Sequence, residues 1–157
     1  MEMMAVEVRE LMAVEKTDAI RLVWDVFLEF EAPDYSQQGI QTFRDFIHDE
    51  AAMNALRFYG AYEKENLVGV IATRHADTHI ALFFVPGNYH RRGIGRKLFE
   101  AILKNCTASI VTVNSSPFAV EAYHKLGFID TDTEQTIQGI RFTPMRYQKI
   151  TPCKSLQ

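Results

Sequence analysis

The chain has 157 residues, of which 47% are hydrophobic, 24% charged and 11% aromatic, and its net charge is −3. This length and composition fit one globular domain that removes about two thirds of its unfolded surface from water. The acidic balance argues against a dedicated nucleic-acid binder, and no apolar run approaches the roughly 20 residues that span a bilayer.

The N-terminus lacks the basic and apolar regions of a signal peptide, so we expect a cytoplasmic protein without membrane contact. Neither Cys106 nor Cys153 has a Cys or His at metal-ligand spacing, which predicts reduced thiols and no metal site. Because no repeat or linker interrupts the chain, we expect a single domain over residues 1–157, with residues 151–157 as a frayed tail.

The first third of the chain predicts one strand and two helices. Residues 6–12 have a strand pattern, and Thr17 and Asp18 then open a helix. Its apolar residues are spaced for one helix face: Ile20, Val23, Trp24, Phe27 and Phe30. Residues 32–36 break this helix. A second helical stretch follows, with Ile40, Phe43, Phe46 and Ile47 at helical spacing.

From Leu56 the hydrophobic period changes to that of strands. Residues 57–63, 66–74 and 78–85 predict three strands joined by short polar turns, which is an antiparallel meander. The third strand is apolar without alternation, which predicts burial on both faces.

The remaining chain predicts a helix from about residue 92 to 105, a parallel strand at 109–114 and a further helix. Ser116 and Pro117 start this last helix as N-cap and first-turn residues, and Gly127 ends it. Two strands, at about 128–133 and 140–150, complete an α+β (mixed α/β) domain. We therefore expect a central, mixed, mostly antiparallel sheet flanked by four helices.

The start of the third predicted helix is unusually basic. Helix N-termini carry partial positive charge and normally collect acidic residues. Here the predicted first turn holds Arg91, Arg92, Arg96 and Lys97, with two glycines, Gly93 and Gly95, among them. Free backbone N–H groups, glycines that allow close approach and basic side chains predict a phosphate or pyrophosphate cradle.

Two common nucleotide motifs do not fit this segment. The P-loop spacing of Gly-x-x-x-x-Gly-Lys-Ser/Thr is absent. A dinucleotide fingerprint needs a third glycine where Leu98 stands and an acidic residue near Ser115.

The segment His90-Arg91-Arg92-Gly93-Ile94-Gly95 instead resembles the Gln/Arg-x-x-Gly-x-Gly/Ala signature of the GNAT N-acetyltransferase superfamily. The stretch from Ser116 to Phe128 is similar to its second signature, Asn-x-x-Ala-x-x-x-Tyr-x-x-x-Gly-Phe, and keeps the Ala, Tyr, Gly and Phe. His90 and Ser116 depart from the two patterns. The resemblance covers nearly the whole chain and implies a GNAT-like fold with a splayed parallel strand pair, which binds acetyl-CoA as co-substrate.

The same resemblance implies roles for individual residues. The pyrophosphate meets backbone N–H groups of residues 91–96, and the pantetheine pairs with the backbone of residues 83–85. The expected cofactor-binding residues are Phe84, Val85, His90, Arg91, Arg92, Gly93, Ile94, Gly95, Arg96, Asn114 and Ser116.

Acetyl transfer to an amine needs a proton acceptor for the amine and a proton donor for the leaving thiolate. Tyr123 occupies the family's acid position, although a buried tyrosine that only packs its helix on the sheet fits the same pattern. His79 matches the position of the family's base, and a water chain to Glu29 or Glu31 is an equal alternative.

Aromatic and carboxylate residues around the first helix break form the expected acceptor site: Phe27, Glu29, Phe30, Glu31 and Tyr35, with Asp34 beside them. The predicted activity is acetyl transfer to a primary amine of an unidentified acceptor. A module of the same fold that senses acyl-CoA without turnover is the alternative. Nucleic-acid binding through residues 90–92 is disfavoured by the net charge, and a homodimer through the C-terminal strands would be ordinary.

Overall fold

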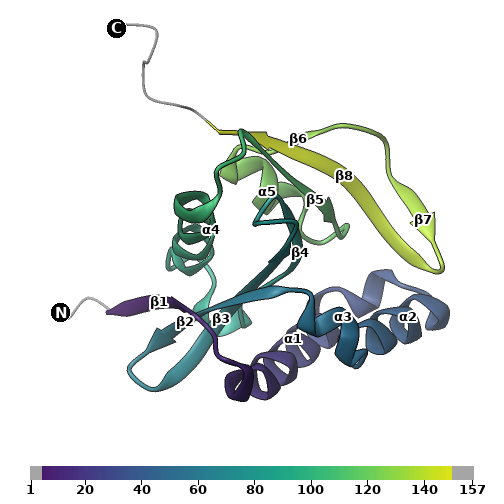
Figure 1. Ribbon diagram of the computed structural model, residues 1–157. Helices are drawn as coiled ribbons and strands as arrows, with labels where there is room; N and C mark the ends of the chain where they lie inside the picture. Colours follow the sequence, from purple (N-terminus) through teal and green to yellow (C-terminus); the bar gives the residue numbers. More distant parts are fainter. Residues whose placement is uncertain (1–4, 150–157) are drawn as a thin grey trace, which may run out of the picture.

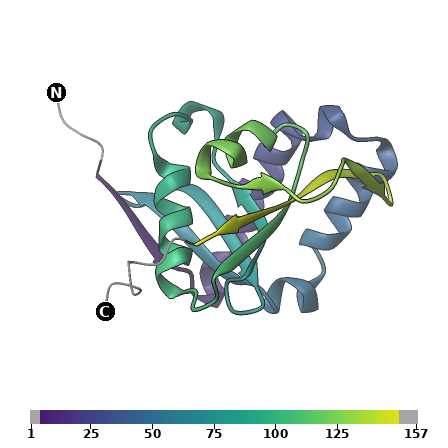
Figure 2. The same cartoon turned by 90° about the horizontal axis from the view of Figure 1, so that it is seen from above.

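The computed structural model describes residues 5–149 and contains one mixed sheet between two layers of helices (Figure 1, Figure 2). The strand order is β1-β2-β3-β4-β5-β8-β6, and β7 pairs with β8. Only β4 and β5 are parallel, so the predicted mixed, mostly antiparallel sheet is confirmed. The predicted tail and Cys153 lie outside the described residues.

The strands are β1 (Val6–Glu10), β2 (Arg57–Glu63), β3 (Asn66–Arg74), β4 (His79–Phe84), β5 (Ile110–Ser115), β6 (Ile129–Asp130), β7 (Gln135–Ile137) and β8 (Ile140–Gln148). The helices are α1 (Lys16–Phe30), α2 (Gln37–Ile47), α3 (Glu50–Asn54), α4 (Ile94–Asn105) and α5 (Val120–Leu126). Between residues 5 and 149 there are thus five helices, not the predicted four. The additional helix, α3, is one turn capped by the Asp49 carboxylate, which accepts from Ala52 N at 3.0 Å. It is too short to show a hydrophobic period.

The helices divide between the two faces of the sheet, as Figure 1 shows. One hydrophobic cluster, the α4 cluster, joins Ile94, Leu98 and Tyr123 to residues of the sheet. The other, the α1 cluster, contains side chains of α1, α2 and α3. On α1 the buried positions are Ala19, Val23, Val26 and Phe27, the spacing of one helix face.

The parallel strands β4 and β5 pair over only two positions, His79 with Thr112 and Ile80 with Val113. Beyond them the strands separate, which confirms the predicted splay. The register between β3 and β4 also shifts near Ala72, so Ile80 belongs to the α4 cluster and Leu82 to the α1 cluster. Helices therefore cover both faces of β4, as the unbroken apolar run predicts. Three residues of the strand are nevertheless only half-buried: His79, Ala81 and Phe83.

A close backbone contact fixes α2 against the turn between β7 and β8. A Cβ atom on Gly39 would lie 2.1 Å from the Gly139 carbonyl oxygen, so only glycine fits there. One turn further along α2, the Thr42 hydroxyl donates to the Gln138 carbonyl at 2.8 Å. These contacts hold the inner face of α2 beside the gap that β4 and β5 leave.

No helix within residues 5–149 is long and apolar enough to cross a membrane. The same part of the chain contains no group of three or more His, Cys, Asp or Glu side chains that could hold a metal ion. Cys106 is a buried free thiol at the end of α4.

Candidate active site

The loop between β4 and α4 forms one side of the candidate site. A short 3-10 turn at Gly87–Tyr89 follows β4, and α4 begins at Ile94 with Gly93 as its N-cap. Gly93 has a φ of +79°, a left-handed conformation that favours glycine. Because this cap delays the helix, Arg91 and Arg92 precede it rather than occupying its first turn as predicted.

The start of α4 presents unsatisfied donors. The first N–H groups of a helix have no partner within it, and no side chain caps those of α4. Nothing lies within 4 Å of the position that a Cβ atom on Gly93 would take, so this point of the loop is open. The first turn has no acidic residue and carries Arg96 and Lys97. Open space, free N–H groups and cationic side chains fit a diphosphate.

His90 ties this loop to the end of β4. Its Nε2 lies 2.6 Å from the Val85 carbonyl oxygen, which can only accept, so Nε2 carries the hydrogen. The His90 ring also lies 5.0 Å from that of Phe30, which stacks on Phe118 at 4.8 Å. Phe30 thus joins the C-terminal end of α1 to the loops that follow β4 and β5.

A pocket of about 290 Å³ lies where β4 and β5 diverge. Members of both hydrophobic clusters line it, so it passes from one face of the sheet to the other. Seven of the predicted site residues converge there: Glu31, Tyr35, His79, Phe84, Asn114, Ser116 and Tyr123.

Glu31 provides a carboxyl group inside this pocket. Burial raises the pKa of Glu31 to about 7, against the opposing effect of a hydrogen bond from the Ser116 hydroxyl. The negative charge of Asp34 adds to the rise in this pKa. Near neutral pH, Glu31 therefore exchanges a proton readily.

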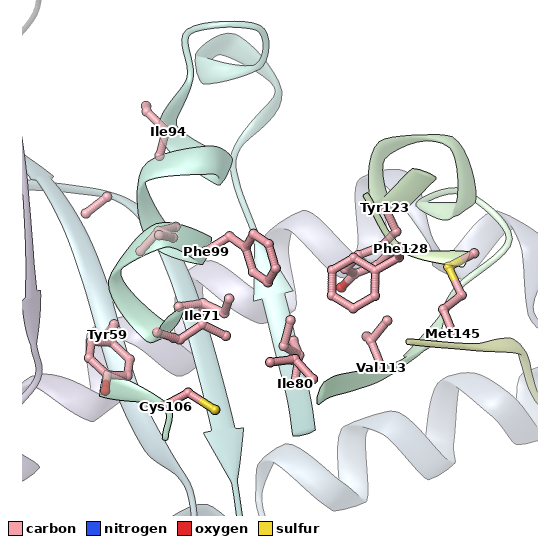
Figure 3. Close-up of a cluster of buried hydrophobic side chains, with 14 of the residues drawn as sticks. Tyr59, Ile71, Ile80, Ile94, Phe99, Cys106, Val113, Tyr123, Phe128 and Met145 are labelled. Atoms are coloured by element: carbon pink, nitrogen blue, oxygen red, sulfur yellow. The ribbon is translucent and has the colours of Figure 1, made fainter. Parts of the chain in front are cut away.

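Tyr123 reaches the pocket from α5, and Figure 3 shows its ring beside Phe128, with Val113 nearby. The side chain is 7% exposed, yet its hydroxyl makes no hydrogen bond to the chain between residues 5 and 149. Burial, followed by the charge of Glu31, raises the pKa of Tyr123, so the phenol stays protonated at neutral pH. Since no buried side-chain oxygen between residues 5 and 149 lacks a partner, this hydroxyl is accessible from the pocket, where a ligand can contact it.

His79 lies at the opposite end of the pocket, at the start of β4. Its Nδ1 is 2.8 Å from the Thr112 hydroxyl oxygen. Burial, and to a lesser extent the charge of Arg74, lowers the pKa of His79 to about 4. The imidazole is therefore neutral near pH 7 and a weak base.

Three residues expected to bind the acceptor do not line the pocket, and one of them is Phe30, which packs against His90 and Phe118. Phe27 is completely buried and stacks on Phe43 with ring centroids 4.0 Å apart, so it belongs to the core and does not contact the pocket. Glu29 is exposed and borders a different groove, with Arg21 and Pro86. Helical rotation explains this difference, since neighbouring residues on α1 point in different directions.

Several residues that line the pocket are not among the predicted site residues: Thr42, Phe43, Phe46, Arg74, Ala119 and Ile140. The sequence pattern predicted Phe43 and Phe46 only as members of an apolar helix face, not as residues that line a pocket. No sequence pattern pointed to Arg74, because an arginine at the end of a strand, before a turn, is common.

A family model described as an acetyltransferase (GNAT) domain matches residues 31–149. Among curated proteins no significant sequence match was found. A GCN5-related N-acetyltransferase from Rhodopseudomonas palustris superposes with a TM-score of 0.80 at 23% identity, covering 94% of this chain and 98% of that one. The PaiA N-acetyltransferase from Thermoplasma acidophilum, solved in complex with coenzyme A, gives 0.75 at 20% identity over 92% and 99%. Apo YjaB from Escherichia coli gives 0.71 at 20% identity over 94% and 100%. With the family model spanning most of the chain and the fold agreeing, this protein belongs to the GNAT acetyltransferase family.

Proposed function

We propose that the protein transfers the acetyl group of acetyl-CoA to a primary amine by direct attack, with both substrates bound at once. The observation that carries this proposal is the pocket through the sheet. It reaches Tyr123 on the α4 side and the residues of α2 on the other side, so two substrates can meet in it from opposite faces.

The α4 side suits the acetyl-CoA. The diphosphate would bind the N–H groups of residues 93–96 together with Arg91, Arg92 and Arg96, and the pantetheine would follow the backbone toward Val85. The coenzyme A in the Thermoplasma acidophilum structure of the same fold supports this assignment. The contact from His90 to the Val85 carbonyl keeps the strand end in place beside that route.

Two side chains that line the pocket, Glu31 and Tyr123, can accept and donate the protons that the reaction moves. Glu31, with a pKa near 7, takes the proton of the amine, because a base works best when its pKa is close to the working pH. Tyr123 gives a proton to the departing thiolate. We favour Glu31 over His79 as the base, since the lowered pKa of His79 makes it a poor proton acceptor.

The proposal is tested by incubating the protein with acetyl-CoA and a panel of primary amines, while thiol release and the mass of the product are followed. We expect acetylated amine in proportion to released CoA, with initial-rate lines that intersect when both substrates are varied. Binding of acetyl-CoA without product from any amine would favour the sensing module instead. Thiol release without an acetylated amine would show hydrolysis and contradict the proposal.

A further inference from the structure

The pocket has an ionisable group near each end. Glu31 lies near the end of β5, where it contacts Ser116. At the other end is Arg74, the last residue of β3, which pairs across the sheet with His79 at the start of β4. Phe84 follows His79 by five positions of β4 in the same pocket, which corresponds to about 16 Å along an extended strand. The two charged groups therefore mark opposite ends of an elongated site.

Arg74 is half-buried, and its guanidinium makes no ion pair or side-chain hydrogen bond with any residue between 5 and 149. Other arginines of the fold are paired: Arg9 with Glu15, Arg57 with Asp77 and Arg141 with Glu134. Partial burial of an unpaired guanidinium costs free energy that an anion would recover.

The surroundings of Arg74 do not neutralise it. His79, which pairs with Arg74 across the sheet, is uncharged near neutral pH because its pKa is lowered to about 4. Of the residues that line the pocket, Glu31 alone is acidic, and it lies near the other end. The Arg74 end of the site is thus positive.

Between these ends the wall on the α2 side is mostly apolar, although Tyr35 and Thr42 also line it. It is formed by Phe43 and Phe46 of α2, with Ala81 of β4 and Ile140 of β8. Aromatic side chains favour flat, apolar ligands, which stack on them. A ligand that fills the site would have a hydrophobic or aromatic body between two polar ends.

We infer that the acceptor is an amino acid in the broad sense, with a primary amine and a remote carboxylate on an aromatic or apolar body, and that Arg74 binds the carboxylate. This inference rests on the proposed function, because it assumes that the amine is delivered to the Glu31 and Tyr123 end. The planar fork of one arginine matches one carboxylate. A diamine would instead place its second cation against Arg74, and this like-charge contact disfavours it.

The test uses three probes with one body and different tails: 4-(2-aminoethyl)benzoate, 4-(2-aminoethyl)benzamide and 4-(2-aminoethyl)benzylamine. The tails are anionic, neutral and cationic. All three probes share the 2-aminoethyl group, and only product acetylated at this amine, identified by fragment masses, is counted. We expect kcat/KM to be about tenfold higher for the benzoate than for the benzamide, with the benzylamine lowest, and the difference to lie mainly in KM.

Arg74→Gln should lower kcat/KM for the benzoate about tenfold and change that for the benzamide less than about threefold. Arg74→Lys, which keeps the charge, should restore part of the preference for the benzoate. Lys104→Gln is the matched control, because it removes one positive charge from an exposed position of α4, outside the residues that line the pocket. It should leave the order of the three probes unchanged. The binding constant of coenzyme A for each variant shows whether the fold is intact.

The inference would be overturned by a benzoate that is acetylated no better than the benzamide, including the case in which neither reacts. It would equally be overturned if Arg74→Gln, with coenzyme A affinity retained, lowered the rates of all three probes by the same factor. An enzyme that prefers the benzylamine would refute the inference and leave the proposed acetyl transfer intact, so the two failures are distinguishable.

Discussion

The two sides of the pocket are built in different ways. On the α4 side, the anion cradle consists largely of backbone: helix N–H groups, a left-handed glycine cap and a loop fixed by one histidine. On the α2 side, the site consists of side chains from α2, β3, β4, β8 and the segment between α1 and α2, several of which also pack in the α1 cluster. A backbone site recognises a ligand common to many enzymes, whereas a side-chain site can change its ligand by substitution. We therefore expect variants on the α4 side to alter cofactor affinity and variants on the α2 side to alter the choice of acceptor.

Tyr123→Phe should have the largest effect on kcat and almost none on the binding of coenzyme A. The substitution removes only the hydroxyl, which has no hydrogen-bond partner in the described chain, so folding should be preserved. We expect kcat to fall by about 10²-fold with the coenzyme A binding constant nearly unchanged. Steady-state kinetics and calorimetry measure the two quantities. A kcat within a factor of two of the parent would remove Tyr123 from the mechanism.

Glu31→Gln tests the base. With a pKa near 7, Glu31 is protonated at lower pH and cannot accept a proton, so kcat/KM of the parent should rise with pH through about 7. The variant should lose about 10- to 100-fold in kcat and lack this rise. Glu29→Gln, two residues away on the exposed side of α1, is the control and should retain the parent profile.

Glu31→Gln should lower activity but raise the stability of the fold above neutral pH. The folded-state pKa of Glu31 is raised above its unfolded value of 4.5, so its contribution to stability is largest below pH 4.5 and is lost as pH rises through about 7. At pH 8, Glu31→Gln should therefore raise the free energy of unfolding by about 1–2 kcal/mol. Urea unfolding at pH 5 and pH 8 measures this. A stabilisation that is equal at both pH values would contradict a perturbed carboxyl.

Gly93→Ala tests the backbone cradle. Alanine would be strained at a φ of +79°, so the loop should relax and the dissociation constant of coenzyme A should rise about tenfold. Gly95→Ala is the comparison: its Cβ atom would meet the Phe83 ring at 3.6 Å, an ordinary contact, and we expect a change below about threefold. Equal effects of the two variants would show that the left-handed cap is not what binds the diphosphate.

His79→Asn should have the smallest effect. The asparagine amide takes the place of Nδ1 and can keep the hydrogen bond to Thr112, and a histidine with a pKa near 4 contributes little as a base near pH 7. We expect kcat to change by less than about threefold. A loss above about 30-fold, together with loss of the pH dependence near 7, would assign the base to His79 in place of Glu31.

The sequence predicted the order of the elements from β1 to β5, apart from α3, and the position of the loop between β4 and α4, because both follow from local patterns. The period of apolar residues located β2 and β3 with their observed bounds and predicted a helix where α2 lies. The glycines and basic residues of the loop lie within one short segment, so their chemistry could be read together. The helix start at residue 92 was wrong, because the left-handed cap at Gly93 delays α4.

The acceptor side could be predicted only in part, since its residues are distant in sequence. Phe27 and Phe30 belong to one predicted helix face, yet only packing shows that Phe27 enters the core while Phe30 reaches the loops. The role proposed for Arg74 follows from the register of β3 with β4 and from the lack of an ion pair to its guanidinium within residues 5–149. Both properties depend on residues that are distant in sequence, so no short sequence pattern predicts them.

Titration calorimetry of the intact protein with acetyl-CoA is the most direct test of the central claim, that the α4 start and the gap between β4 and β5 form a coenzyme A site. We predict heat with a stoichiometry of one and an affinity that Arg96→Gln weakens and Tyr123→Phe does not. No heat with either acetyl-CoA or coenzyme A, from protein shown to be folded, would contradict the site and the mechanism built on it.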